Sequence, residues 1–221
     1  MANLETQKNV GYFDVRLRPD ARRSIVWKEI VSYLTPWLQT RNKKVVEIAA
    51  GYCAFINAIS SSSRTAIDID PIVMESAEKG VTAHVSDLRQ SWPQGPFDIV
   101  LASNFFEHLT NNEFEQMLTD IWRNTAPQAK LCIIQPNFRY AWREYFDDYT
   151  HKKIFTHEGI LGILRASGWS ILHVEPRFLP FSLKSSPGRI PLIFYAYIVR
   201  WYLRSPWRPR AGQMLIIAQK P

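Results

Sequence analysis

The chain of 221 residues is long enough for one large domain with an ample core, and 46% of its residues are apolar while 21% are charged, an ordinary globular composition. No apolar run reaches the ~20 residues of a membrane-spanning helix, and the polar start "MANLETQKNV" predicts no signal peptide. The two cysteines form neither a CxxC pair nor a Cys/His metal pattern. We therefore expect two reduced thiols in a cytosolic protein.

The formal net charge of +7 is unevenly distributed. Residues 1–175 hold 19 Lys or Arg and 20 Asp or Glu, whereas residues 176–221 hold eight Lys or Arg and no acid. A basic segment of this kind attracts the phosphate groups of nucleic acids, anionic lipids or phosphorylated substrates. The last part of the chain is therefore a candidate binding surface.

The predicted elements alternate between helices and strands. A helical pattern begins at about Ala21, and we expect residues 1–40 to form an N-terminal helical cap. Apolar, β-branched stretches predict seven strands, at 44–49, 65–70, 83–87, 97–103, 129–136, 169–176 and 213–220. Further helices are predicted after Pro71 and over 111–124 and 156–167, the last with Thr156 as its N-cap.

This alternation predicts an α/β domain over residues 41–221, with a doubly wound, mostly parallel sheet. Ligands of such folds lie beyond the carboxyl ends of the strands. Three successive predicted strands end on an acid, at Glu47, Asp68 and Asp87. Asp68 stands 21 residues beyond Glu47, a spacing at which a carboxylate holds a ribose diol. Asp87 suits the exocyclic amine of adenine and Leu88 the face of the base, so these residues outline an adenosine pocket.

The motifs around these acids resemble those of class I S-adenosylmethionine-dependent methyltransferases over residues 45–175 and in the last strand. "EIAAGYC" stands where the family has an acid and then three alternate glycines, with Ala49, Gly51 and Cys53 at the glycine positions. "AIDID" and "SDL" match the ribose and adenine stretches, and "FDIVLASNFFEHL" closely resembles the fourth-strand motif. The resemblance implies a Rossmann-like methyltransferase fold of seven strands with an antiparallel last strand.

The resemblance also implies S-adenosyl-L-methionine as the cofactor. The residues expected to bind it are Glu47, Ala49, Gly51, Asp68, Ile69, Asp87, Leu88 and Asn104. The first loop departs from the family at Ala49 and Cys53. Because this cofactor has no pyrophosphate, the loop needs fewer glycines than a dinucleotide site does. Ala49 is acceptable unless its φ must be positive, and we expect the loop to bind the cofactor.

His108 and His151 are the candidate catalytic residues. His108 follows the fourth strand, near the expected methyl group, and a base is needed if the acceptor is a hydroxyl; a histidine that only packs or forms a hydrogen bond is the alternative. Some relatives bind a divalent metal here through Glu-x-x-Glu-His, but Asn104 occupies the first position. We therefore predict no metal site.

The stretch "YAWREYFDDYTHKKIF" contains His151 and is dense in aromatic and polar residues. We expect it to cover the acceptor pocket, where aromatic rings stack on sugars and Asp147, Asp148 and His151 hold or deprotonate hydroxyls. A polar lid held by its own ion pairs is the alternative.

The family usually joins its last two strands by a tight hairpin, but here a basic, aromatic insertion is expected at about 179–212. Arginines interleaved with Trp and Tyr fit peripheral contact with an anionic membrane through residues 186–210. This placement would put a cytoplasmic protein at the inner face of the membrane. A helix that packs on the domain or on a second subunit is the alternative.

Together these features predict a methyltransferase that acts on a small-molecule, glycan or lipid-linked acceptor, with O-methylation expected. An RNA methyltransferase is the second hypothesis, prompted by the basic segment. "SNFF" lacks the Asn-Pro-Pro-aromatic motif of base-methylating enzymes, which argues against nucleic acid bases as acceptors. A non-catalytic module with the same fold is the third. A Rossmann oxidoreductase ranks last, because the loop lacks the pyrophosphate glycines.

Overall fold

The computed structural model describes residues 21–181 and 191–221. Within this part the chain forms a seven-stranded sheet in the order β3-β2-β1-β4-β5-β7-β6. Its strands are β1 (Lys44–Ile48), β2 (Ser63–Asp68), β3 (Val81–Val85), β4 (Phe97–Ser103), β5 (Thr125–Pro136), β6 (Ser170–Glu175) and β7 (Gln213–Gln219). Neighbouring strands are parallel except at β7, which is antiparallel to both β5 and β6. The predicted doubly wound sheet with an antiparallel last strand is confirmed.

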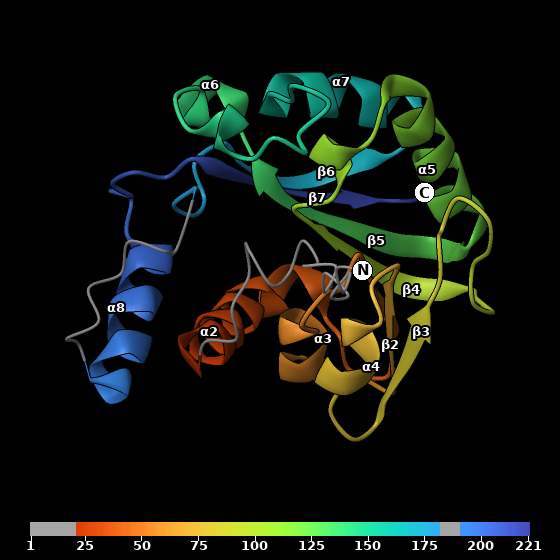
Figure 1. The fold of residues 1–221 in the computed structure, drawn as a ribbon, viewed down its shortest axis with the longest axis horizontal. Helices are drawn as coiled ribbons and strands as arrows, with labels where there is room; N and C mark the ends of the chain where they lie inside the picture. The colour runs from red at the N-terminus through yellow and green to blue at the C-terminus, as the bar shows by residue number, and fades with distance from the viewer. Residues whose placement is uncertain (1–20, 182–190) are drawn as a thin grey trace, which may run out of the picture.

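Helices cover both faces of the sheet (Figure 1). One face carries α2 (Ala21–Leu38), α3 (Ala54–Ala58) and α4 (Ile72–Ser76), and the other carries α5 (Asn111–Arg123) and α7 (His157–Ala166). Successive strand residues point to opposite faces, so Val45 and Leu101 join the core beneath α2 and α3. Val46 and Val100 join the core beneath α5 and α7. The strands are apolar on both sides because both sides are covered.

Threonine N-caps begin the two longer helices of the second face. Thr110 accepts a hydrogen bond from the N–H of Glu113, whose carboxylate accepts one from the Thr110 N–H, which makes a capping box. Thr156 accepts from the N–H of Gly159 at 3.2 Å, as its predicted role as N-cap requires. The capping box lies immediately after the turn that holds Glu107 and His108, and it therefore sets where that turn ends.

Several strand boundaries differ from the prediction: β2 covers Ser63–Asp68 rather than 65–70, and β5 begins at Thr125 rather than at 129. The third strand was expected at 83–87, but β3 begins at Val81, where pairing with Arg64 starts. Gly80, with a φ of +86°, makes the preceding turn and fixes this start. Asp87 therefore lies beyond the end of β3 rather than in the strand.

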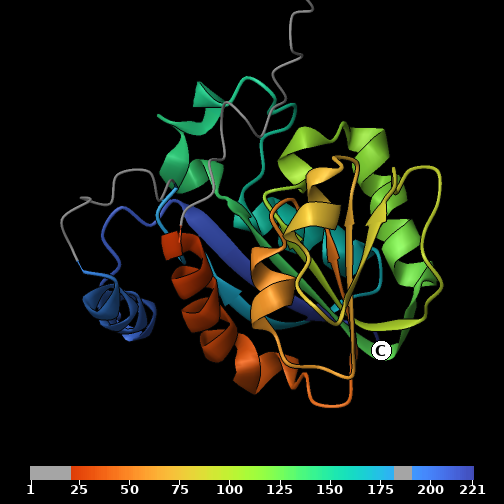
Figure 2. The same cartoon turned by 60° about the horizontal axis from the view of Figure 1, so that its bottom comes forward.

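The insertion between β6 and β7 contains helix α8 (Leu192–Arg204). Residues 182–190 of the insertion and residues 1–20 of the expected N-terminal cap lie outside the described residues. Helix α8 runs beside α2 (Figure 2), and its Tyr195 and Leu203 are buried in the same core cluster as Leu34 of α2. The Arg200 guanidinium adds two hydrogen bonds of 2.8 Å to the Glu29 carboxylate. The inner face of α8 thus packs on the domain, which agrees with the alternative of a helix packed on the domain.

Candidate active site

The carboxyl ends of β1, β2 and β4 meet at one edge of the sheet. Ile48 near the end of β1 pairs with Ile67 of β2 on one side and Ala102 of β4 on the other. The N–H of Ser86, just after β3, donates to the carbonyl of Asp68 at 2.9 Å. The loops that carry the predicted cofactor residues therefore leave the sheet side by side, as expected for a parallel α/β fold.

Asp68 is the centre of the loop network at this edge. Its carboxylate oxygens accept hydrogen bonds from the backbone N–H groups of Gly51 (2.7 Å) and Asp70 (2.8 Å). Burial raises the pKa of Asp68, and these hydrogen bonds partly offset the effect. A carboxylate has about four lone-pair positions. These contacts leave acceptor capacity for a ribose hydroxyl, and Asp68 fits an adenosine ligand.

All three glycine positions of the first loop have a left-handed backbone. The φ angles are 53° at Ala49, 48° at Gly51 and 55° at Cys53. Ala49 therefore does have a positive φ, which is unfavourable for alanine. A non-glycine residue in this region is strained by roughly 1–2 kcal/mol. Hydrogen bonds hold the loop in place: Ala50 N–H donates to the Ile67 carbonyl at 3.0 Å, and Cys53 N–H to the Ala50 carbonyl at 2.8 Å.

Glu47 is buried beneath this loop. Its carboxylate accepts a hydrogen bond of 3.0 Å from the N–H of Ile56 and so anchors α3 to β1. Burial raises the pKa of Glu47 to about 8, with a further contribution from the nearby charge of Asp68. The structure therefore gives Glu47 a role in supporting the loop.

Asp87 is oriented by a neighbouring arginine. Arg89 donates from Nη2 to Oδ2 of Asp87 at 2.7 Å and from Nε to Oδ1 at 2.9 Å, and it also reaches Glu113 of α5 at 2.8 Å. The hydrogen bonds from the Arg89 side chain lower the pKa of Asp87. The adjacent Leu88 is buried, whereas Ile69 is 65% exposed beside the loops. Asp87 thus carries a fixed negative charge at the expected adenine end.

Asn104 stands at the turn after β4 and has a φ of 49°, a conformation that asparagine tolerates. Its N–H donates to the Ile134 carbonyl at 2.8 Å, and its Oδ1 accepts from Nε2 of Gln213 at 3.2 Å. These contacts tie the turn to β5 and β7. The side chain is held at the carboxyl edge, next to the turn η1 (Phe106–His108).

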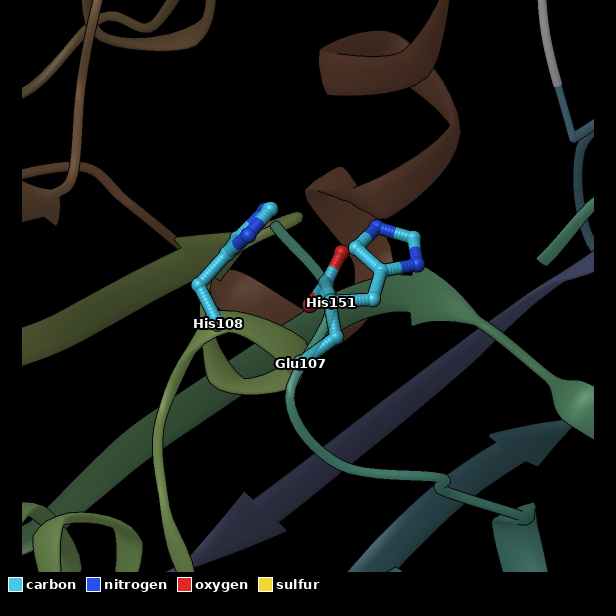
Figure 3. Close-up of side chains that lie close together, drawn as sticks. All are labelled: Glu107, His108 and His151. Carbon is cyan, nitrogen blue, oxygen red and sulfur yellow. The ribbon is translucent and has the colours of Figure 1, made fainter. Parts of the chain in front are cut away.

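The structure brings the two predicted catalytic histidines together. Their ring centroids are 5.0 Å apart, and the carboxylate of Glu107 lies close to both rings (Figure 3). The backbone makes this approach possible, because the N–H groups of Lys152 and Lys153 donate to the Glu107 carbonyl at 2.8 and 3.2 Å. His108 and His151, from loops far apart in the sequence, therefore share one site with Glu107.

Glu107 is the most unusual member of this group. Its exposed fraction is 0%, and neither of its carboxylate oxygens has a hydrogen-bond partner among the described residues. Burial raises the pKa of Glu107 to about 8. Buried polar groups are nearly always satisfied, so a carboxylate of this kind points to a ligand.

The hydrogen bonds of Thr150 fix the tautomer of His108. The Thr150 hydroxyl donates to Oδ1 of Asp148 at 2.6 Å, so it has no further hydrogen to give. Nδ1 of His108 faces this hydroxyl at 3.0 Å and the Thr150 carbonyl at 3.3 Å. Both oxygens are acceptors, so Nδ1 carries the proton and Nε2 carries the lone pair. Burial lowers the pKa of His108 and favours the neutral ring.

Sequence reasoning missed two features of the site. Tyr145 follows in η2 (Tyr145–Asp147), after the short helix α6 (Phe138–Ala141), and its fully buried ring packs on His151 at 4.7 Å. Gln135, near the end of β5, is buried, and its side-chain amide has no partner among the described residues. The signal for Gln135 was present, because it is a polar residue directly after the apolar run "LCII".

Comparison with known proteins identifies the family. Residues 20–174 match the family model described as a methyltransferase domain. No curated protein sequence matches the chain. Among solved structures, a SAM-dependent methyltransferase from Archaeoglobus fulgidus has a TM-score of 0.64 at 21% identity, over 90% of this chain and 94% of that one.

Two further solved structures contain the cofactor product. The N-methyltransferase NodS from Bradyrhizobium japonicum WM9, in complex with S-adenosyl-L-homocysteine, has a TM-score of 0.62 at 14% identity over 96% of this chain and 93% of that one. The plantazolicin methyltransferase BpumL, in complex with a desmethylPZN analog and the same product, has a TM-score of 0.60 at 13% identity over 90% and 83%. At these identities the likeness shows the fold.

The order of the strands and the match to the family model identify one class of protein. This class is the S-adenosylmethionine-dependent methyltransferases with a Rossmann-like fold. The chain belongs to the methyltransferase domain family within class I of these enzymes. S-adenosyl-L-methionine is accordingly its cofactor.

Proposed function

We propose that this methyltransferase transfers its methyl group to a hydroxyl of a small-molecule, glycan or lipid-linked acceptor. The observation that carries the proposal is the group formed by the buried Glu107 and the half-buried His108 and His151, next to Asn104. A hydroxyl keeps its proton at neutral pH, so its methylation needs groups that act on that proton. An amine acceptor only has to be held neutral and aligned.

For the cofactor, we assign the ribose diol to Asp68 and the adenine amine to Asp87, with Leu88 and Ile69 beside the base. Ala49 and Gly51 present backbone to the cofactor, Glu47 supports them from below, and Asn104 faces the methionine part. When bound, S-adenosylmethionine supplies an activated methyl group on a sulfonium. The contribution of the protein is then alignment and exclusion of water.

The acceptor proposal is supported by exposed aromatic rings beyond β5. Large exposed side chains in this stretch are Tyr140, Trp142, Phe146 and Tyr149. An open groove next to them is lined in part by Tyr140, Arg177 and Trp207, and the Arg177 guanidinium lies 5.3 Å from the centroid of the Tyr140 ring. Aromatic faces suit sugar rings, and an arginine suits an acidic or phosphorylated group.

We assign His108 and His151 to the acceptor hydroxyl. As the hydroxyl gives its proton to Nε2 of His108, its oxygen forms a bond to the methyl carbon and the carbon–sulfur bond breaks. The bonding electron pair stays on sulfur, and S-adenosylhomocysteine is the second product. Nε2 of His108 carries a lone pair and is oriented for this task by the Nδ1 hydrogen bonds to Thr150.

An acceptor screen tests the proposal. The full chain is incubated with methyl-labelled cofactor and four acceptor sets: glycosides, polyprenyl-phosphate-linked sugars, the matching amino sugars, and an RNA transcript. We expect label in hydroxyl acceptors, with NMR of the product showing an O-methyl group. Label confined to the amino sugars would contradict O-methylation, and label confined to RNA would favour the second hypothesis.

We further propose that the insertion touches an anionic membrane surface. No helix in the described part of the chain is long and apolar enough to cross a membrane. Exposed large apolar side chains of the insertion are Phe194, Tyr197, Ile198, Trp201 and Trp207. Arg204 and Arg210 are exposed near them, whereas Arg200 and Arg208 are bonded to Glu29 and Glu175. The aromatic residues thus contribute more to the proposed contact than expected, and the arginines less.

Vesicle flotation tests this contact. We expect the protein to float with vesicles that contain phosphatidylglycerol, less so with pure phosphatidylcholine, and less at high salt. Equal recovery with both lipids, or no recovery with either, would contradict it.

A further inference from the structure

Three metal-binding side chains converge beside the turn after β4. A carboxylate oxygen of Glu107 and one ring nitrogen each of His108 and His151 all lie within 4.8 Å of one another. We propose that these three residues bind a divalent transition-metal ion and that the ion activates the acceptor hydroxyl. The inference deepens the proposed function; the role of the ion rests on that function, whereas its binding does not.

The state of Glu107 is the first argument. Its carboxylate is fully buried, and neither oxygen has a hydrogen-bond partner among the described residues. A buried carboxylate is normally paired, hydrogen-bonded or bound to a metal. Figure 3 shows the carboxylate on the same side as the two imidazole rings, so one ligand atom from each of the three side chains can reach a common ion.

The orientation of His108 is the second argument. A histidine that binds a metal usually donates its other ring N–H to a carbonyl or carboxylate, which fixes the ligating nitrogen. Nδ1 of His108 donates to Thr150, whose hydroxyl donates in turn to Asp148 at 2.6 Å. Nε2 is left as the ligating atom. The Thr150–Asp148 pair supports the ring as such a partner should.

The position of His151 is the third argument. Backbone hydrogen bonds from Lys152 and Lys153 to the Glu107 carbonyl hold the loop of His151 against the turn of Glu107, and the buried Tyr145 ring packs on the imidazole. Ligand atoms of a tetrahedral zinc ion lie about 3.4 Å apart, since each is ~2.1 Å from the metal. Small side-chain rotations therefore bring the three atoms from their present separations to an ion.

The donor set indicates both the class of ion and its use. Two imidazoles and one carboxylate suit zinc, iron(II) or cobalt(II) better than magnesium or calcium, which prefer oxygen ligands. Three protein ligands leave coordination positions open, as in catalytic metal sites. With the ion bound, Nε2 of His108 is a ligand and no longer a base, so the ion takes over the role proposed above for the free ring. An acceptor hydroxyl in an open position loses its proton to solvent more readily, because the ion stabilises the alkoxide. The alkoxide oxygen then takes the methyl group as the carbon–sulfur bond breaks, with the electron pair left on sulfur.

The metal site was not predicted from the sequence because its ligands come from two separate segments of the chain. The family pattern Glu-x-x-Glu-His has Asn104 in its first position, and the replacement ligand His151 comes from another loop. The inference thus departs from the expectation of no metal, and it uses a ligand that only the fold supplies.

Cobalt(II) is the probe, because its visible absorption reports tetrahedral ligation by nitrogen and oxygen without any need for activity. The full chain, stripped of metal with chelator, is titrated with Co²⁺. We expect a saturable absorption band that Zn²⁺ displaces. Glu107→Gln and His151→Asn should each abolish the band or weaken Co²⁺ affinity at least tenfold. His84→Asn, in the edge strand β3, which β2 and β1 separate from β4, should leave the titration unchanged.

Two readouts separate a lost site from a lost fold. All variants should bind S-adenosylhomocysteine as wild type does. Metal-free Glu107→Gln should melt close to metal-free wild type, because it exchanges one buried neutral polar group for another, while its melting temperature should no longer respond to Zn²⁺. The inference is overturned if wild type develops no Co²⁺ band, or if Glu107→Gln retains it.

The experiments distinguish failure of the metal site from failure of the proposed function. A wild-type Co²⁺ band together with methylation of amines alone would leave the site standing and remove the hydroxyl assignment. Hydroxyl methylation that persists at the full rate after chelation would keep the proposed function and overturn the role of the ion.

Discussion

The backbone N–H of Gly51 donates a hydrogen bond of 2.7 Å to the carboxylate of Asp68. This contact fastens the loop after β1 to the end of β2, so the first loop and the carboxylate that we propose for the ribose are built as one unit. If Asp68 holds the ribose as proposed, the loop is already in place before the cofactor arrives, and little has to be ordered on binding.

Asp68→Ala should weaken binding of S-adenosylmethionine by roughly 1–3 kcal/mol, the usual loss when hydrogen bonds to a charged group are removed. The measurement is calorimetric titration of the cofactor. Asp98→Ala is the matched control, because Asp98 is also a strand carboxylate but pairs with Lys43 at the opposite edge of the sheet. The Asp98→Ala variant should bind S-adenosylmethionine as tightly as wild type does.

A cofactor analogue separates loss of the ribose contact from loosening of the loop. Wild type and Asp68→Ala should bind S-adenosylhomocysteine without ribose hydroxyls about equally if Asp68 acts on the diol. A deficit of the same size with this analogue would show that Asp68 works only through Gly51.

Ala49→Gly should stabilise the fold. The left-handed φ of 53° strains alanine by roughly 1–2 kcal/mol, and glycine returns about 0.4–1 kcal/mol of this through the greater entropy of the unfolded chain. We expect a net gain of at most about 1 kcal/mol in the free energy of unfolding, measured with denaturant. Ala50→Gly next to it should destabilise, because Ala50 is buried and is not among the positive-φ residues. Equal effects at both positions would rule out strain as the cause.

The sheet could be predicted from the sequence because its strands are apolar, β-branched runs separated by helical patterns, a local signal. The loop conformation could not, because Ala49 and Cys53 do not favour positive φ and adopt it only under tertiary contacts. The residues proposed to act on the acceptor could be predicted only in part. Both histidines were recognisable as candidates, but their contact depends on backbone hydrogen bonds from Lys152 and Lys153 to Glu107, which no local pattern encodes.

The two faces of α8 give opposite mutational effects. Leu203 is fully buried, so Leu203→Ala should cost about 2–5 kcal/mol of unfolding free energy, the usual range for a core leucine. Trp201 is 60% exposed, so Trp201→Ser should leave stability within about 0.5 kcal/mol of wild type. Denaturant unfolding measures both. Trp201→Ser should also reduce recovery on phosphatidylglycerol vesicles, and unchanged recovery would remove Trp201 from the proposed membrane contact.

Glu47→Gln should change how stability depends on pH. Burial raises the pKa of Glu47 from 4.5 to about 8, so between these values the folded protein keeps a proton that the unfolded chain has released. Stability from this group is therefore complete below pH 4.5 and is lost as the pH rises to 8. Glutamine stays neutral and still offers an oxygen to the N–H of Ile56. Denaturant unfolding of both proteins from pH 4 to 9 makes the comparison.

The difference between Glu47→Gln and wild type should be smallest near pH 4, grow in favour of glutamine up to about pH 8, and level off above it. Cys53 does not blur this window, because burial raises its thiol pKa to about 12 and it stays neutral throughout. Asp68, whose pKa is also raised by burial, is present in both proteins, so its contribution is common to both. A difference that is constant across the range would mean that Glu47 is ionised in the folded state, held so by groups other than the Ile56 N–H.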